Sequence, residues 1–86
     1  MAEKINHEVD VSAINWSARG DGVGEASDIG LAPGVWPTWL IVKGPEGTPC
    51  AGLYQRYESR YDQENELQSI RYWRKATGVF ITILND

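Results

Sequence analysis

The sequence predicts a mainly β fold: a small single-domain antiparallel sheet, curved or barrel-like, built from hairpins, with at most one short helix. Two runs, Trp39–Val42 and Val79–Leu84, are almost wholly apolar and rich in the β-branched and aromatic residues that strands favour. Glycine- and proline-containing segments separate the candidate strands at the spacing of hairpins. No stretch carries the sustained period of a long amphipathic helix.

The first strand is predicted where apolar and polar residues alternate from Val9 to Ala13. The alternation changes phase at Ile14, which indicates a β-bulge or a strand end at that point. Residues 17–24 are rich in glycine and are expected to form a loop. Residues 25–33 are weakly determined, and either a short strand or a turn of helix fits them.

The middle of the chain predicts a hairpin. A strand is expected from about Trp36 to Lys43, because Pro37 suits the first residue of a strand, where no backbone donor is needed. Residues 44–47 read Gly-Pro-Glu-Gly, a strong turn signal. A second strand follows from about Cys50 to Tyr57.

Residues 54–66 allow two interpretations. Tyr54, Tyr57 and Tyr61 have the spacing of one helical face, but the preceding turn favours a strand over the first half. A polar loop is expected over residues 62–66. The choice between strand and helix stays open at this point.

The C-terminal part predicts a second hairpin. Leu67–Trp73 is a candidate strand, residues 74–78 have the length and the glycine of a hairpin loop, and Val79–Leu84 is the last strand. The total is five or six strands.

The two apolar runs need to be buried on both of their faces. A half-buried strand alternates apolar and polar residues, whereas Trp39–Val42 and Val79–Leu84 are apolar on both faces. A helix, a long loop or another copy of the protein must cover the second face. Because an 86-residue chain builds about one small core and has little chain to spare, we expect a homodimer.

The composition of the chain indicates its domain number, its possible partners and its cellular compartment. We expect one domain over residues 1–86, with a frayed N-terminus over residues 1–7. The net charge of −4 and the pI of 4.8 make this an acidic protein and disfavour nucleic acid as a partner. The single Cys50 indicates a reducing compartment, and neither a signal peptide nor a membrane-length apolar run is present. We therefore expect a soluble cytoplasmic protein that does not bind membranes.

No motif predicts catalysis, a metal or a cofactor, so we expect a protein that is not an enzyme. The glycines of residues 20–24 lack the spacing and the following helix of a dinucleotide-binding fingerprint. His7 and Cys50 are the single residues of their types and show no catalytic or zinc-ligand spacing. The acidic residues from Asp62 to Glu66 lack the glycine and glutamate positions of a calcium loop, so a solvated turn is expected.

Aromatic residues interleaved with arginines form the most suggestive pattern. The simplest interpretation is that the rings fill the core and the arginines keep the sheet soluble. The same residue types are enriched at protein interfaces, and exposed rings beside arginines also stack unpaired bases. The candidate interaction surface comprises Trp36, Arg56, Tyr57, Tyr61, Arg71, Trp73 and Arg74.

From these patterns we expect a non-catalytic protein-interaction module that self-associates, with a protein partner as a further possibility. Its biological role is not encoded in any motif. The alternative is a β-barrel that binds a small ligand or single-stranded nucleic acid with the aromatic and arginine face.

Overall fold

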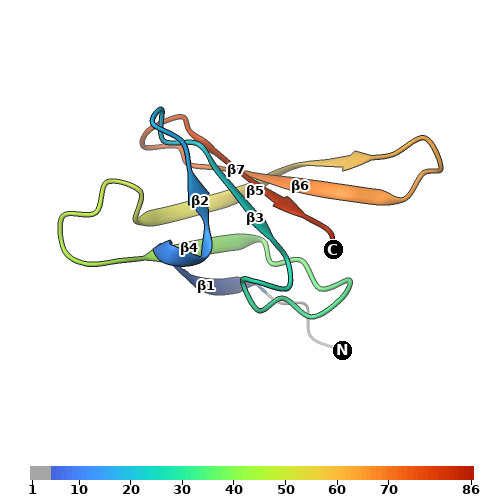
Figure 1. Cartoon of the computed structure of the whole chain (residues 1–86), viewed down its shortest axis with the longest axis horizontal. Helices are drawn as coiled ribbons and strands as arrows, with labels where there is room; N and C mark the ends of the chain where they lie inside the picture. The colour runs from blue at the N-terminus through green and yellow to red at the C-terminus, as the bar shows by residue number, and fades with distance from the viewer. Residues whose placement is uncertain (1–4) are drawn as a thin grey trace.

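The computed structural model describes residues 5–86, and its strands form one curled sheet that resembles half of a barrel (Figure 1). This confirms the predicted mainly β fold class. The one helical element within residues 5–86 is a 3₁₀ helix, η1 (Val11–Ala13). The strands are β1 (Asn6–Asp10), β2 (Asn15–Trp16), β3 (Gly22–Glu25), β4 (Trp39–Lys43), β5 (Gly52–Tyr61), β6 (Leu67–Trp73) and β7 (Phe80–Leu84).

The strand order is β1-β4-β5-β6-β7-β3-β2. The pairs β4–β5 and β6–β7 are the two antiparallel hairpins that the sequence predicts, and β5 pairs antiparallel with β6 between them. At the flanks, β1 pairs with β4 and β3 pairs with β7 in parallel. The sequence did not indicate these two pairings, because parallel partners are joined by long connections rather than by a turn.

The core lies on the inner face of the curled sheet. Alternate residues of a strand point to the same face, so β4, β6 and β7 each contribute every second side chain to it. The segment of residues 26–31 and Ile14 cover this face from the other side. The buried apolar residues are Val9, Ile14, Ala26, Ile29, Leu31, Leu40, Val42, Tyr54, Ile70, Tyr72, Ile81 and Ile83.

Two tyrosines fill the centre of this core. Tyr54 and Tyr72 are both fully buried, and each hydroxyl donates a hydrogen bond to a backbone carbonyl. Tyr54 donates to the carbonyl of Cys50 at 2.8 Å, and Tyr72 to that of Pro37 at 2.7 Å. Burial raises the pKa of both phenols. A buried ring therefore keeps its polar atom satisfied, and part of the aromatic pattern is core.

Three expectations for the N-terminal part are wrong, including the strand predicted over Val9–Ala13. Asn6 and His7 are not frayed, because both lie in β1, and the Trp39 amide donates to the carbonyl of the preceding Ile5 at 2.8 Å. Residues 1–4 lie outside the described residues. The predicted loop over residues 17–24 is shorter, because its last three residues belong to β3. The first strand ends at Asp10, and η1 follows it.

The glycines of β3 serve close packing. A Cβ atom placed on Gly22 would lie 2.6 Å from Cγ2 of Ile14 and 2.9 Å from the ring of Trp16. Both neighbours belong to the core or pack against it. The missing side chain therefore makes room for larger ones, as glycine does where chain segments approach closely.

The C-terminal hairpins agree closely with the sequence. Leu67–Trp73 forms β6 with the predicted bounds, and Gly78 in the β6–β7 loop has the left-handed φ of 76°. Residues 54–61 are strand rather than helix. As a result β5 is long, and the distal part of the β5–β6 hairpin projects beyond the rest of the sheet (Figure 1).

No helix within residues 5–86 combines the length and the apolar character that crossing a bilayer requires.

Candidate functional site

The outer face of the sheet carries a cluster of aromatic side chains. The ring of Tyr57 lies 5.3 Å from that of Phe80, edge to face, and 6.2 Å from that of Trp73, measured between centroids. The guanidinium of Arg71 lies 3.9 Å from the centroid of Phe80, within the range of a cation–π contact. We call Tyr57, Arg71, Trp73 and Phe80 the outer aromatic cluster.

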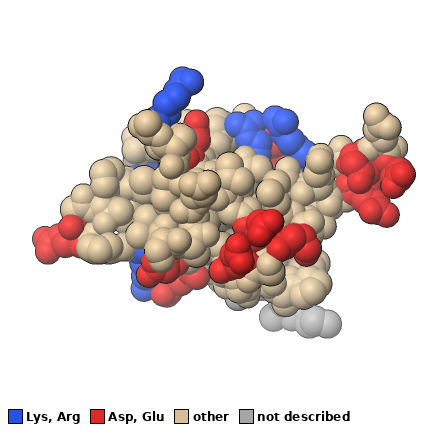
Figure 2. All heavy atoms as spheres, in the orientation of Figure 1, with Lys and Arg blue, Asp and Glu red and all other residues tan. Residues whose placement is uncertain are grey.

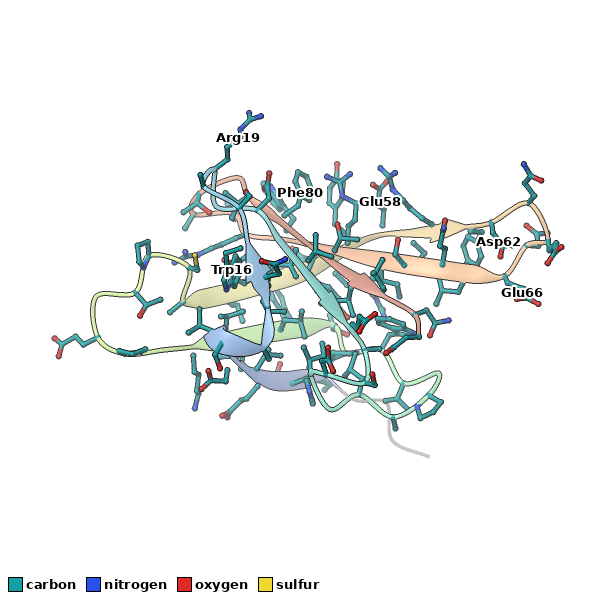
Figure 3. All side chains as sticks on the ribbon, in the orientation of Figure 1. Trp16, Arg19, Glu58, Asp62, Glu66 and Phe80 are labelled. Carbon is teal, nitrogen blue, oxygen red and sulfur yellow. The ribbon has the colours of Figure 1, made fainter. Side chains whose placement is uncertain are left out.

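A carboxylate fixes the arginine of this cluster. Glu58 accepts a hydrogen bond from Arg71 at 2.7 Å and a longer one from Arg60 at 3.4 Å. The bond from Arg71 is the main reason that the pKa of Glu58 is lowered. Glu58 and Phe80 project from the same side of the sheet, whereas Trp16 lies on the opposite, inner side (Figure 3). The outer face thus combines rings with charges of both signs.

The local geometry of β5 presents Tyr57 to solvent. The pairing of β5 with β6 is irregular between Arg56 and Glu58, so that Tyr57 is an extra residue in the ladder. Such bulges redirect side chains and increase the local twist. Tyr57 keeps 58% of its surface exposed although it contacts two other rings. Tyr54, three residues earlier, is fully buried, so the two rings serve different faces.

A shallow groove lies beside the cluster. Its volume is about 620 Å³, and indole and aliphatic side chains of β4, β5 and β6 form much of its wall. Leu53 in this groove is 52% exposed. The groove is lined by Trp39, Leu53, Gln55, Trp73, Arg74, Lys75 and Ala76.

The structure brings together three of the seven predicted surface residues, namely Tyr57, Arg71 and Trp73. Arg74 lines the adjacent groove, and its guanidinium donates a hydrogen bond to the Pro49 carbonyl in the β4–β5 connection at 2.8 Å. The remaining three lie elsewhere.

Arg56 and Trp36 belong to the inner side. Trp36 packs against the core, and its carbonyl accepts a hydrogen bond from the guanidinium of Arg56 at 3.1 Å. Tyr61 lies at the far end of β5, where it is 59% exposed. The predicted surface is therefore not one continuous patch.

Sequence reasoning missed four residues of this region: Trp39, Leu53, Glu58 and Phe80. Phe80 and Trp39 stand in the two apolar runs, whose second face needed cover. The apolar residues on both faces of these runs were the signal in the sequence that could have identified Trp39 and Phe80. Trp39, Ile41 and Phe80 are only half-buried, so the described chain covers the outer side of these runs incompletely.

The groups considered for catalysis or metal binding lie in different parts of the described chain. The imidazole Nε2 of His7 bonds the carbonyl of Ile29, and Cys50 lies in the β4–β5 connection. The carboxylate oxygens of Asp62, Glu64 and Glu66 lie within 4.8 Å of one another, and all three residues are exposed.

The loop over residues 62–66 uses its acidic residues to hold its own shape. Asp62 Oδ1 accepts the backbone amides of Glu64 and Glu66, both at 2.9 Å. Asn65 takes the left-handed φ of 64°, which asparagine tolerates. Acidic atoms cover this end of the molecule (Figure 2), where Figure 3 places Asp62 and Glu66.

Comparison with known proteins finds no matching family model, no matching curated protein and no matching solved structure. The geometry of the outer face therefore carries the functional argument.

Proposed function

We propose that this protein is a non-catalytic interaction module that self-associates, and that the outer aromatic cluster belongs to its contact surface. The observation that carries the proposal is the exposure of Tyr57 and Leu53 on a face whose other rings are only half-buried. Tyrosine, tryptophan and arginine dominate the binding energy of protein interfaces. Exposed apolar surface that is contiguous on one face is typical of a binding site.

The incomplete burial of the two apolar runs supports a second copy as the partner. The inner sides of the two apolar runs are covered by residues 26–31 and by Ile14. Their outer sides, with Trp39 on β4 and Phe80 on β7, have only partial cover from the described chain. The commonest soluble oligomers are symmetric homodimers, so a second copy is the simplest partner for this incompletely covered region.

The charges on this face favour protein over nucleic acid. Arg71 and Arg60 both contact Glu58, so the carboxylate offsets part of the positive charge of these two arginines. A surface that binds single strands needs arginines that are available to phosphates. Arginines that already contact a carboxylate are less available to phosphates, which favours a protein partner.

The experiment is sedimentation velocity from low to high micromolar concentration, on the unaltered protein and on Tyr57→Ser. We expect a shift from monomer to dimer with concentration, and a weaker shift for Tyr57→Ser. Val35→Ser is the matched control, because Val35 is an exposed apolar residue outside the cluster. A protein that stays monomeric at high micromolar concentration contradicts the proposal.

The groove supports a second candidate function, the binding of a small aromatic anion. Trp39 and Trp73 offer two indole walls, and Lys75 stands at the rim with a positive charge. Concave apolar sites with a few polar groups are typical of ligand pockets. Native mass spectrometry separates the candidates: a monomer that carries extra mass favours the ligand, and a dimer without extra mass favours self-association.

A further inference from the structure

The second half of β5 is an open sheet edge. β4 pairs with residues 52–55 of β5, and the last bond on that side joins the Arg56 amide to the Thr38 carbonyl at 2.9 Å. Within residues 5–86, no strand lies on that side of Tyr57–Tyr61, whose neighbour is β6 alone. Figure 1 shows this part of the hairpin projecting from the sheet. An open edge presents backbone donors and acceptors to another chain.

The open edge is complementary to itself. Tyr57–Tyr61 reads Tyr-Glu-Ser-Arg-Tyr, so its charges exchange places when the order is reversed. Antiparallel pairing of two copies about Ser59 sets Glu58 opposite Arg60 of the second copy, twice. Opposite charges on facing strands stabilise the pair, and like charges destabilise it. A two-fold axis requires this kind of self-complementary surface.

We propose that two copies of this chain associate by antiparallel pairing of Tyr57–Tyr61, with Ser59 on the two-fold axis; this inference rests on the self-association proposed above. The two sheets then become continuous across the dimer. The outer aromatic clusters of both copies lie on the same side of the joined sheet, and the contact includes Tyr57 of each cluster, which lies in the paired segment itself.

The positions of the charges fit this arrangement. In the β5–β6 ladder, Glu58 lies opposite Arg71 and Arg60 lies opposite Ser69. The carboxylate of Glu58 also lies 3.4 Å from the guanidinium of Arg60 on its own strand, so the side chains of Glu58 and Arg60 share a face. In the dimer, each Glu58 gains an arginine of the second copy on that face. The exposed rings of Tyr57 and Tyr61 flank these charges and supply apolar area.

The remaining edges fit a second copy less well. β1 carries two acids, Glu8 and Asp10, and no lysine or arginine, so pairing with itself brings like charges together. β2 is two residues long. The β5 edge is itself short and is bounded by irregular pairing at Arg56/Glu58 and Arg60/Tyr61. We therefore expect a weak dimer, with a Kd on the order of micromolar or above.

Charge exchange tests the register. Glu58→Arg and Arg60→Glu each place like charges opposite each other, twice in a homodimer, so each homodimer is expected to weaken by about tenfold. In an equimolar mixture the two variants complement each other, because every 58–60 contact again joins opposite charges. We expect the mixture to form a heterodimer that neither variant forms alone, in sedimentation and in native mass spectra. Arg19→Glu is the control for Arg60→Glu, because it changes the net charge equally at an exposed loop.

The outcomes separate this inference from the proposed function. If the unaltered protein stays monomeric, both are contradicted. If it dimerises and Arg60→Glu dimerises equally well, or if the mixture of folded variants stays monomeric, the edge pairing is contradicted and self-association stands. Circular dichroism of each variant establishes that it is folded.

Cross-linking supplies a second measurement that keeps the charges unchanged. In a Cys50→Ser background, Ser59→Cys is expected to give a disulfide-linked dimer on mild oxidation with oxidised glutathione, because facing residues have Cβ atoms about 5 Å apart. Ser17→Cys, at another exposed serine, is the control. Equal cross-linking of both variants contradicts the pairing about Ser59.

Discussion

The inner and outer faces of this sheet use the same residue types for different purposes. Tyr54 and Tyr72 on the inner face are fully buried, with each hydroxyl bonded to a backbone carbonyl. Tyr57 on the outer face contacts rings on two neighbouring strands and is 58% exposed. The face on which a ring lies, rather than its residue type, therefore decides whether the ring stabilises the fold or remains available to a partner.

The strongest way to test this comparison is to truncate one ring on each face. Tyr72→Ala removes a fully buried ring and is expected to lower the free energy of unfolding by about 3–5 kcal/mol. Tyr57→Ala removes a largely exposed ring and is expected to cost under about 1 kcal/mol. Urea denaturation of both variants measures the difference. Equal losses would mean that the outer aromatic cluster is part of the core.

A small domain has a narrow stability margin, so Tyr72→Ala could leave no folded protein to compare. Tyr72→Phe is the milder variant for that case. It keeps the ring but leaves the Pro37 carbonyl without its donor, at an expected cost of about 1–2 kcal/mol. Tyr57→Phe is its matched control, and we expect no measurable loss of stability from it.

Neighbouring positions of β3 allow the stability contributions of the inner and outer faces to be compared within one strand. Gly22→Ala places a methyl group against Ile14 and Trp16 on the inner face, so we expect a loss of about 1–3 kcal/mol. Val23→Ala, at an exposed position on the other face, is expected to change stability by less than about 1 kcal/mol. Thermal unfolding of both variants is the measurement. A neutral Gly22→Ala would show that the close approach at β3 is not tightly packed.

A smaller effect is expected from the ionic contacts of the outer face. Arg71→Ala removes the cation–π contact with Phe80 and the hydrogen bond to Glu58, at an expected cost of about 1 kcal/mol. Arg19→Ala, at the tip of the β2–β3 connection (Figure 3), is the control. The readout is the denaturation midpoint at low and high salt. A loss that salt does not diminish would mean that packing rather than charge is lost.

The smallest expected effect is a pH dependence. The bond from Arg71 lowers the pKa of folded Glu58 from the ordinary value of 4.5, so the folded state binds its proton less readily than the unfolded state does. This contribution to stability is complete above the unfolded pKa and is lost as the pH falls through the lower, folded one. We expect Glu58→Gln to make stability fall less steeply over that acidic range. An unchanged slope would contradict a structural role for the contact.

Much of the fold was predictable from the sequence because hairpins leave local signals. Alternation within Leu67–Trp73 and the glycine of the following loop predict β6 and its turn, and both are confirmed. β3 was not predictable, because Gly22 and Gly24 carry no side chain whose pattern could be read, and its partner β7 lies at the other end of the chain. Each parallel pairing, β1 with β4 and β3 with β7, joins segments far apart in the sequence and leaves no local signal.

The outer face was predictable only in part. Interleaved aromatics and arginines indicated Tyr57, Arg71 and Trp73, which the structure brings together. The same pattern could not separate them from Tyr54, because the choice between strand and helix stayed open for residues 54–66, and a helix would place Tyr54 and Tyr57 on one face. Phe80 was missed because it stands in a run that also supplies the core.

The most direct measurement is a dilution series of ¹H–¹⁵N correlation spectra of the unaltered protein. The account predicts concentration-dependent amide shifts at Tyr57–Tyr61 and in the outer aromatic cluster, and constant shifts for inner-face residues such as Tyr72. Spectra that do not change with concentration, or shifts confined to residues away from β5, would contradict it.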